Sequence, residues 1–379
     1  MELKSILDHH DLQSVRVLMR VPFNVPVIDG KVAGSPRIDC ALATVRHLQT
    51  RGARLILISH IGNDFSNTAS LQPVYEYIKK KIQVSFVDDV IGVKARKAIT
   101  ALKDGEVLLL ENLRRYPGEG MNDLSFAKDL ASLADIYVND DFPASHRPHA
   151  SLIGVPRFIP SYAGPCFVAE VKGLSAALVP KSPSLAILGG AKLVTKEKLL
   201  RALLEKYDHV FVGGALSNDF FHAQGFEVGQ SIVSRTGSVN DLLHNSKIIL
   251  PTDVVVSDSD GSETKSPDQV TEGETIVDIG PESIANLQSV IEKSKMVLWN
   301  GPMGNFEKGF KEQTETLAKM IAKAKGESVV GGGDTIASIE KLNLHKDFTF
   351  VSTAGGAMLA FLAHGTLPGI DALVAGRGL

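Results

Sequence analysis

Short apolar runs rich in Val, Ile and Leu recur along the whole chain, and segments of helical length with one apolar face separate them. Continuous apolar runs are typical of strands buried on both faces, and their alternation with helices predicts parallel sheets covered on both sides. The runs are residues 15–21, 54–58, 84–87, 107–110, 136–138, 185–188, 210–212, 248–256, 276–279, 296–299, 328–330 and 348–351. They are too many for one sheet, so the pattern predicts two doubly wound, Rossmann-like α/β domains.

The boundary between the two domains is predicted from a helical segment at residues 163–178, which Pro180 and Pro183 follow. We expect a first domain at residues 1–164, an interdomain helix at 165–180 and a second domain at 181–364. Residues 257–268 are polar and poor in apolar side chains, and are expected to form a surface loop.

Composition excludes several classes of protein. With 40 Lys and Arg against 43 Asp and Glu, the net charge of -3 argues against a nucleic-acid partner. Residues 348–370 carry no charged side chain, but Gly355, Gly356 and Pro368 favour a strand, a turn and a helix over a membrane span. The acidic N-terminus has no apolar signal segment, so we expect a soluble, cytoplasmic protein without a membrane partner. Cys40 and Cys166 are expected to be reduced thiols there.

Glycines and polar residues follow most of the apolar runs. Open α/β sheets bind ligands outside the carboxyl ends of their strands, so these followers predict two sites that face each other across a cleft. The followers are residues 59–62, 111–114, 139–140 and 146–147 in the first half, and residues 189–192, 213–214, 300–302, 331–335 and 352–356 in the second.

Glycine-rich segments between a strand and a helix let backbone N–H groups approach a phosphate at the helix N-terminus. Residues 331–335 and 352–356 fit this role, although each is also compatible with an ordinary tight turn. The chain has no GxxxxGK[ST] or GxGxxG motif, which argues against a P-loop or a dinucleotide site, and no HExxH or GxSxG motif for zinc or serine hydrolysis.

The second half offers charged candidates beside these turns. Lys192 and Lys196 are four residues apart and share a helix face, where two ammonium groups would neutralise a transferring phosphoryl group; the same spacing fits an ordinary charged helix face. Asp334 and Thr335 suit either a Mg²⁺–phosphate contact or a simple helix N-cap. Glu307 suits ribose hydroxyls or a plain loop position.

The first half offers arginines and histidines at or near strand ends, namely Arg37, His60, Arg114, His146 and Arg147. Guanidinium groups bind phosphate and carboxylate groups through two parallel hydrogen bonds, although scattered surface arginines are also common. The pair His146 and His149 has metal-ligand spacing, but no other ligand cluster accompanies it, so we favour contact with an anion.

In this order and at these separations, the motifs resemble those of the phosphoglycerate kinase family over nearly the whole chain. The segments that carry the resemblance are RVPFNVP (20–26), LLENLR (109–114), VNDDFPASHRPHAS (138–151), GGAKLVTK (189–196), DIGP (278–281), WNGPMGNFE (299–307), GGGDT (331–335) and STAGGA (352–357). The resemblance implies two domains joined by a helix, with a C-terminal tail at about 365–379 that packs on the first. It also implies a monomeric glycolytic enzyme with hinge bending.

The implied reaction is reversible phosphoryl transfer between 1,3-bisphosphoglycerate and MgADP, which gives 3-phosphoglycerate and MgATP. By the resemblance, the first domain binds the acid through Asn24, Arg37, His60, Arg114, His146 and Arg147. The second binds the nucleotide through Gly190, Lys192, Lys196, Gly214, Glu307, Gly332, Gly333, Asp334 and Thr335, with Asp334 near the Mg²⁺. Arg37, Lys196, Gly333 and Gly355 are the implied catalytic residues, because the attacking carboxylate needs no general base and the transfer needs positive charge and amide donors.

Several positions depart from the family pattern. The family motif is RVDFNVP, whereas this chain has Pro22 in place of the Asp, and Asn63 stands where the family usually has Arg. A smaller departure is Asp141 in place of Ala. The changes at Pro22 and Asn63 leave an alternative open, namely a catalytically weakened or inactive nucleotide-binding protein on the same fold.

Overall fold

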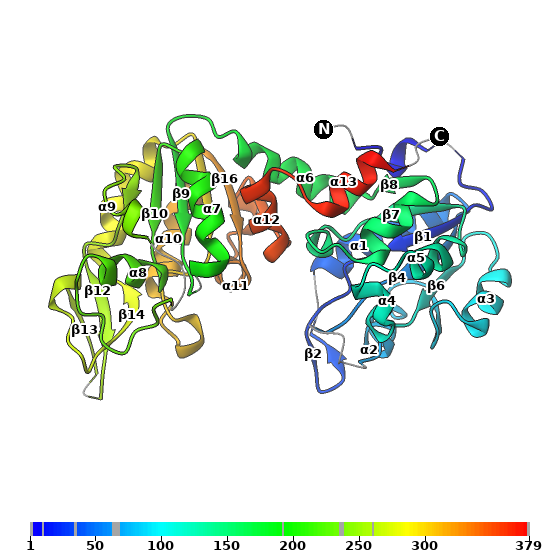
Figure 1. Cartoon of the computed structure of the whole chain (residues 1–379), viewed down its shortest axis with the longest axis horizontal. Helices are drawn as coiled ribbons and strands as arrows, with labels where there is room; N and C mark the ends of the chain where they lie inside the picture. Colours follow the sequence, from blue (N-terminus) through cyan, green and yellow to red (C-terminus); the bar gives the residue numbers. More distant parts are fainter. Residues whose placement is uncertain are drawn as a thin grey trace. The chain divides into compact units, whose positions relative to one another are not determined.

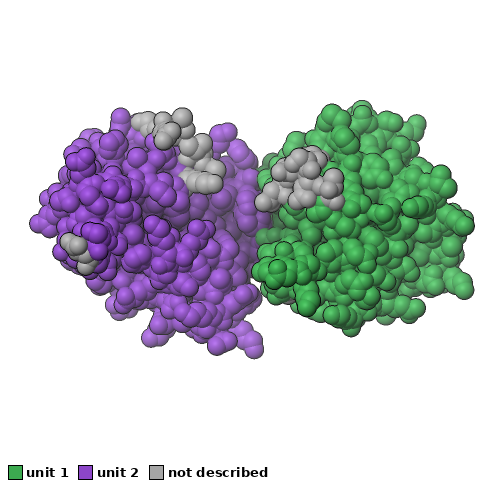
Figure 2. All heavy atoms as spheres, turned by 90° about the horizontal axis from the view of Figure 1, so that it is seen from below, with its two compact units in different colours: residues 1–172, 366–379 green, residues 173–365 purple. Residues whose placement is uncertain are grey.

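The computed structural model describes residues 3–9, 11–33, 36–62, 69–191, 193–234, 239–259 and 261–376. Contacts divide the chain into two compact units, which are residues 1–172 with 366–379 (unit 1) and residues 173–365 (unit 2) (Figure 2). Each unit contains a six-stranded parallel sheet with helices packed around it (Figure 1). Helix α6 (Pro165–Leu178) contains the point in the sequence where the units divide.

Unit 1 is built on the strand order β5-β6-β4-β1-β7-β8. The strands are β1 (Arg16–Arg20), β4 (Arg54–Ile58), β5 (Ser85–Val87), β6 (Val107–Leu110), β7 (Ile136–Asn139) and β8 (Ser161–Ala163), with a small hairpin of β2 (Val27–Ile28) and β3 (Lys31–Val32). The helices are α1 (Pro36–Thr50), α2 (Gln72–Ile78), α3 (Val93–Thr100), α4 (Pro117–Gly120), α5 (Leu124–Ala131) and α13 (Pro368–Ala375). The strand order changes direction between β1 and β7, which is where open α/β sheets bind their ligands.

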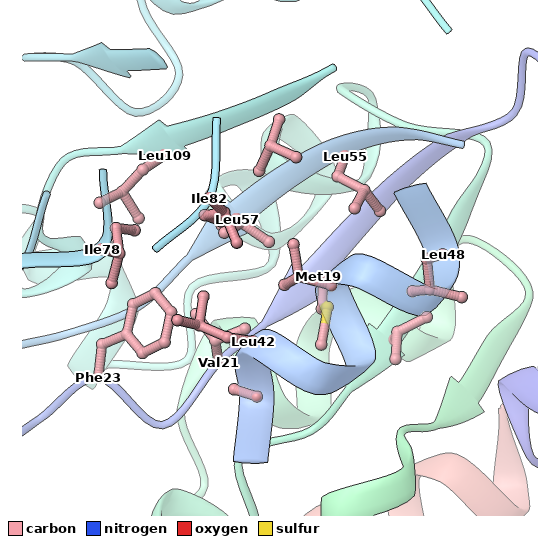
Figure 3. Packing of buried hydrophobic residues seen from close by; sticks show 14 of the residues in the cluster. Met19, Val21, Phe23, Leu42, Leu48, Leu55, Leu57, Ile78, Ile82 and Leu109 are labelled. Atoms are coloured by element: carbon pink, nitrogen blue, oxygen red, sulfur yellow. The ribbon is translucent and has the colours of Figure 1, made fainter. Parts of the chain in front are cut away.

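The core of unit 1 lies between α1 and the central strands. Leu42 and Leu48 of α1 belong to one buried cluster with Met19 of β1 and with Leu55 and Leu57 of β4 (Figure 3). Since alternate residues of a strand point to opposite faces, Leu55 and Leu57 share the face that packs against this cluster. This packing holds the N-terminal turn of α1 near the carboxyl ends of the strands.

Unit 2 repeats the architecture with the strand order β11-β10-β9-β15-β16-β17. The strands are β9 (Ser184–Leu188), β10 (His209–Val212), β11 (Ile248–Ile249), β15 (Met296–Asn300), β16 (Glu327–Gly331) and β17 (Phe350–Ser352). The helices are α7 (Leu193–Lys206), α8 (Leu216–Ala223), α9 (Pro281–Lys293), α10 (Glu312–Lys323), α11 (Gly333–Lys341) and α12 (Gly356–His364). All residues of β9 and β15 are buried, as expected for strands covered on both faces.

Two details of the strand prediction for unit 2 are wrong. The run 248–256 is two strands, β11 and β12 (Val254–Ser257), and Pro251 lies in the break between them. The segment 257–268 is not a loop throughout, because β13 (Ser262–Lys265) pairs antiparallel with β12, which also pairs with β14 (Thr275–Ile279). The exposed face of β13 explains its polar composition, since antiparallel sheets can leave one face in water.

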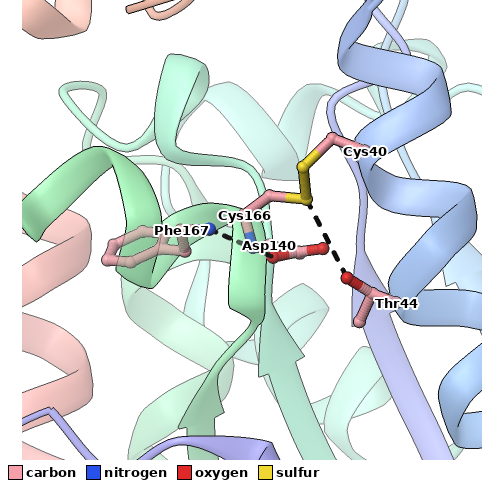
Figure 4. The surroundings of a disulfide bond; sticks show 5 residues. All are labelled: Cys40, Thr44, Asp140, Cys166 and Phe167. Atoms are coloured by element: carbon pink, nitrogen blue, oxygen red, sulfur yellow. Dashed lines mark hydrogen bonds between the residues drawn. A yellow bond between two sulfur atoms is a disulfide. The ribbon is translucent and has the colours of Figure 1, made fainter. Parts of the chain in front are cut away.

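The expectation of two free thiols is also wrong. Cys40 of α1 and Cys166 in the first turn of α6 form a disulfide with Cα atoms 6.2 Å apart (Figure 4). Asp140 Oδ1 accepts hydrogen bonds from the backbone N–H groups of Cys166 (2.9 Å) and Phe167 (3.1 Å), and so caps α6 beside the disulfide. The pairing depends on the packing of α1 against α6, which the separation of 126 residues does not reveal.

Within the described residues, no single helix has the length and apolar content needed to cross a membrane. Helices α12 and α13 reach that length and content only when they are taken together across the break between them. The apolar segment predicted as strand, turn and helix contains β17, a turn with Gly355, and α12.

Candidate functional site

Arg20 is the centre of a buried polar network at the carboxyl ends of the strands in unit 1. The side chain is fully buried, and its Nη1 lies 2.7 Å from Asp141 Oδ2. Its Nε donates a hydrogen bond to Ser151 Oγ (3.1 Å), and Ser151 in turn donates to the buried carboxylate of Glu119 (2.6 Å). A buried guanidinium without such partners would carry a large desolvation penalty, which the carboxyl groups of Asp141 and Glu119 offset.

His60 follows β4 and contacts this network directly. Arg20 Nη2 lies 2.6 Å from His60 Nδ1. Because an arginine nitrogen only donates, Nδ1 accepts, and the ring proton of a neutral His60 is on Nε2. Burial, and then the positive charges of Arg20 and Arg114 among others, hold the pKa of His60 well below its usual range. The residue is therefore a neutral hydrogen-bond donor at pH 7.

Arg114 lies in the turn after β6 and is also buried. Its backbone N–H donates to Asn112 Oδ1 (3.0 Å), and its guanidinium donates to the carbonyl of Gly62. The N–H of Gly62 donates to Asn24 Oδ1 (3.1 Å), so Asn24 and Arg114 are joined through one backbone turn. Asn63, the next residue, lies outside the described residues.

The remaining acid-site candidates lie around the same network. Arg37 occupies the first turn of α1, half-buried, and Asp141 and Glu170 partly offset the lowering of its pKa that burial causes. Arg147 Nε donates to His146 Nε2 (3.3 Å), and burial, with the charge of Arg147, lowers the pKa of His146. Asn24, Arg37, His60, Arg114, His146 and Arg147 thus belong to one group of cationic and neutral donors at one edge of the sheet, an arrangement suited to a small molecule with several negative charges.

The glycine turns of unit 2 meet at the carboxyl ends of β9, β10 and β15. Gly190 N donates to the carbonyl of Pro302 (2.9 Å). Gly214 has a φ of +61°, and a Cβ there would lie 2.7 Å from Gly190 N and 2.8 Å from the Pro302 oxygen. Only glycine allows this approach without a shift of the backbone, so Gly214 fixes the distance between the turns.

Lys196 of α7 lies beneath these turns. Its Nζ donates to the carbonyls of Gly189 (2.5 Å) and Asn300 (3.3 Å), and the side chain is 9% exposed. Burial lowers its pKa to about 8. Among the described residues no carboxylate pairs with it, so the ammonium group is a desolvated cation at the point where the strand order reverses between β9 and β15.

Two helices of unit 2 begin at the same edge. Gly332, with a φ of +107°, precedes α11, which starts at Gly333, and Gly355 precedes α12. Asp334 is exposed in the first turn of α11, whereas Thr335 is fully buried, with no hydrogen-bond partner for its Oγ1 among the described residues. Free N–H groups and the helix dipole favour anions at such starts.

Glu307 is exposed in the short 3₁₀ helix Phe306–Lys308, and Lys192 lies outside the described residues. In the part of the chain that the structure describes, no group of three or more His, Cys, Asp or Glu side chains is placed to hold a metal ion. Sequence reasoning missed the roles of Arg20 and Glu119, because their importance depends on burial that a single sequence does not display.

Comparisons with known proteins identify the family. The phosphoglycerate kinase family model matches residues 7–365. The chain is 42% identical to the phosphoglycerate kinase of Wolbachia sp. subsp. Drosophila simulans (strain wRi), over 97% of this chain and 98% of that protein, and 41% identical to that of Moorella thermoacetica, over 98% and 99%.

Solved structures agree with this. The fold is similar to phosphoglycerate kinase from Coxiella burnetii, with a TM-score of 0.85 and 36% identity over 98% of this chain and 99% of that one. It is equally similar to the enzyme from Pyrococcus horikoshii OT3, with a TM-score of 0.85 and 31% identity over 98% of both chains. The chain therefore belongs to the phosphoglycerate kinase family, and its activity is the family's phosphoryl transfer between ATP and 3-phosphoglycerate.

Proposed function

We propose that unit 1 binds the acid and unit 2 binds the nucleotide, each at the carboxyl edge of its own sheet. The observation that carries the proposal is the difference between the two edges. The edge of unit 1 gathers buried guanidinium groups and the neutral His60, whereas the edge of unit 2 gathers glycine turns and the desolvated Lys196. The first suits a small molecule with carboxylate and phosphate groups, and the second suits a polyphosphate.

In unit 1, Arg37, Arg114 and Arg147 are proposed to bind the charged groups of 3-phosphoglycerate. His60 donates from Nε2, because its Nδ1 is occupied by Arg20. Asn24 and His146 complete the contacts through their polar atoms. Arg37 lies in the first turn of α1, and the packing of α1 on the sheet holds that turn in place.

In unit 2, Gly190, Gly214, Gly332 and Gly333 are proposed to surround the phosphates of ADP or ATP with backbone N–H groups. Lys192 and Glu307 are further proposed contacts, the latter to the ribose hydroxyls. Mg²⁺ enters as part of the nucleotide substrate, and Asp334 is proposed to approach it, since carboxylate oxygens are ligands that Mg²⁺ accepts. Thr335 is proposed to bind a phosphate through its N–H.

The chemistry needs no proton transfer at the nucleophile. When ATP is formed from the acyl phosphate, a β-phosphate oxygen of ADP bonds to phosphorus and the carboxylate leaves; in reverse, the carboxylate, ionised at pH 7, attacks the γ-phosphorus and ADP leaves. Lys196 and Arg37 are proposed to neutralise the transferring group, and the helix starts at Gly333 and Gly355 to supply amide donors. Since each unit holds one substrate, hinge bending at α6 is proposed to accompany catalysis, in a monomeric cytoplasmic enzyme.

The test is turnover of MgATP with 3-phosphoglycerate, with the acyl phosphate measured through an NADH-consuming dehydrogenase. We expect Lys196→Ala and Arg37→Ala to lower kcat by at least about 10³-fold. The matched controls are Lys198→Ala on α7 and Arg46→Ala on α1, both exposed positions on the same helices. Unchanged turnover in Lys196→Ala or Arg37→Ala contradicts the assigned roles.

The alternative from the sequence, an inactive nucleotide-binding protein, predicts MgADP binding without 3-phosphoglycerate binding. No comparison favours it. Calorimetric titration of the wild-type protein with 3-phosphoglycerate distinguishes the two, because the alternative requires that no binding heat is observed.

A further inference from the structure

Pro22 and Asp141 occupy equivalent positions beyond two neighbouring strands. Strands β1 and β7 pair in parallel, with Arg20 opposite Asn139. Asp140 N donates to the carbonyl of Arg20 (2.9 Å), and this hydrogen bond belongs to the Arg20–Asn139 pair, the last pair of the ladder. Pro22 and Asp141 each lie two residues after the last paired residue of two adjacent strands, at the point where the strand order of unit 1 changes direction.

Asp141 is held firmly at this position. The residue is 1% exposed, its N–H donates to Asn139 Oδ1 (3.0 Å), and its Oδ1 accepts from Ala144 N (3.1 Å). Its Oδ2 lies 2.7 Å from Arg20 Nη1 but has no hydrogen bond of good geometry. This oxygen is therefore a buried acceptor whose main interaction is with the positive charges around it.

Those charges belong to the acid-binding group. Burial raises the pKa of Asp141, and the positive charges of Arg20, Arg37 and Arg147 oppose that rise. Of these, Arg37 and Arg147 are proposed acid ligands, and Arg20 contacts a third, His60. Removal of the carboxylate would leave Arg20 without its nearest countercharge and would increase the repulsion among the cations.

The family motif, in contrast, has its Asp at position 22 and a small residue at position 141. Proline at position 22 has neither a carboxylate nor an N–H, whereas Asp141 supplies a carboxylate on the adjacent strand end. We propose that Asp141 is the acidic positioning residue of the acid half-site and replaces the carboxylate that the motif carries at position 22. This proposal rests on the proposed function of unit 1.

The role is to position cations rather than to react. Asp141 supplies the negative charge next to the Arg20 guanidinium. Arg20 donates a hydrogen bond to His60 Nδ1, so that Nε2 of the same ring is the nitrogen that can donate to the acid. The negative charge of Asp141 also favours the positive charges of Arg37 and Arg147, two of the proposed ligands of the acid. Loss of the Asp141 carboxylate should weaken binding of the acid much more than binding of the nucleotide, because the proposed ligands of the nucleotide all belong to unit 2.

The experiment is a double-mutant cycle of Asp141→Ala, Pro22→Asp and Pro22→Asp/Asp141→Ala, with KM for each substrate as the readout. Asp141→Ala is expected to raise KM for 3-phosphoglycerate about 10- to 100-fold with KM for MgATP unchanged. Pro22→Asp alone adds a second carboxylate at the end of the neighbouring strand, and it is also expected to raise KM for 3-phosphoglycerate. The double variant restores the family arrangement and is expected to return to within about fivefold of wild type.

The proposal is overturned if the double variant binds the acid no better than Asp141→Ala, or if Asp141→Ala changes both KM values equally. Asp141→Asn, which keeps the size and the Oδ1 acceptor, provides the same KM comparison if the alanine variant does not fold. Failure of the proposed function itself is distinguishable, because it would appear as wild-type protein with no turnover that depends on 3-phosphoglycerate.

Discussion

Cys40 and Cys166 are joined by a disulfide that ties α1 to the first turn of α6, across 126 residues of sequence. Thr44 Oγ1, one turn along α1 from Cys40, lies 3.9 Å from Cys166 Sγ, and Asp140 caps the same turn of α6 (Figure 4). The disulfide therefore connects the helix that carries Arg37 to the helix in which the two units divide.

Reduction of this disulfide is expected to lower the free energy of unfolding of unit 1 by about 2–4 kcal/mol, because the unfolded chain loses a long closed loop. Hydrogen exchange with and without a dithiol reductant measures the effect. Exchange should rise in α1 and at the start of α6, and should stay unchanged in the sheet of unit 2. The control is Cys40→Ser/Cys166→Ser, which should behave as the reduced protein under both conditions. A native mass that shows two free thiols contradicts the disulfide.

The parts of the fold that were predictable are those set by local pattern. Strands β9 and β15 are buried on both faces, so every position except Asn300 is apolar or small and the run is visible in the sequence. Strand β13 was missed because it is exposed and polar, and its strand conformation comes from pairing with β12. Local pattern therefore predicted the strands of the two parallel sheets except β8. It also marked the segments that form β12 and β14, but not their antiparallel pairing with each other and with β13.

Some features of the candidate site could likewise be predicted from the sequence, and others could not. Glycine turns and arginines after strands could be recognised from their order along the chain. The pairing of Arg20 with Asp141 could not, because it depends on the register between β1 and β7, which brings together residues 121 positions apart. The same limit applies to Cys40 and Cys166, whose distance is set by helix packing alone.

His60 is expected to remain neutral at pH values where an ordinary histidine is already protonated, because burial and the neighbouring arginines hold its pKa well below the usual range. Its folded-state pKa lies well below its ordinary value, so the unfolded chain binds the proton more strongly, and its contribution to stability is lost as the pH falls below about 6.5. Nitrogen-15 NMR of the ring should show an unprotonated Nδ1 and a protonated Nε2, with the resonance assigned through its loss in His60→Gln. A protonation midpoint near 6.5 would contradict the lowered pKa, and a protonated Nδ1 in the neutral ring would contradict the tautomer deduced from Arg20.

Gly214→Ala is expected to weaken MgADP binding at least about tenfold, because its Cβ would collide with the backbone of Gly190 and Pro302. Gly225→Ala is the matched control: its φ of +88° is also positive, but a Cβ there meets nothing within 4 Å. Both variants should lose about 1–2 kcal/mol of stability from the left-handed backbone. Calorimetric titration separates them, and equal affinities for MgADP would show that the close approach of the turns is not needed.

Lys196→Met is expected to stabilise the protein while it abolishes turnover. Burial lowers the pKa of Lys196 to about 8, against an ordinary value near 10.5, so the folded protein bears a penalty for the buried charge on the order of 3 kcal/mol at pH 7. That penalty is fully present below pH 8 and is relieved as the pH rises from about 8 to 10.5. Methionine keeps the apolar stem without the charge.

Thermal unfolding at pH 7 and pH 9.5 measures the effect. The variant should melt at a higher temperature than wild type at pH 7, and the gap should narrow at pH 9.5 as wild-type Lys196 loses its proton. Lys198→Met, at an exposed position on the same helix, should change neither melting temperature nor turnover. A Lys196→Met variant that is less stable than wild type at pH 7 would show that the two carbonyl contacts of the ammonium group outweigh its desolvation, and that Lys196 stabilises the turns of unit 2 even without nucleotide.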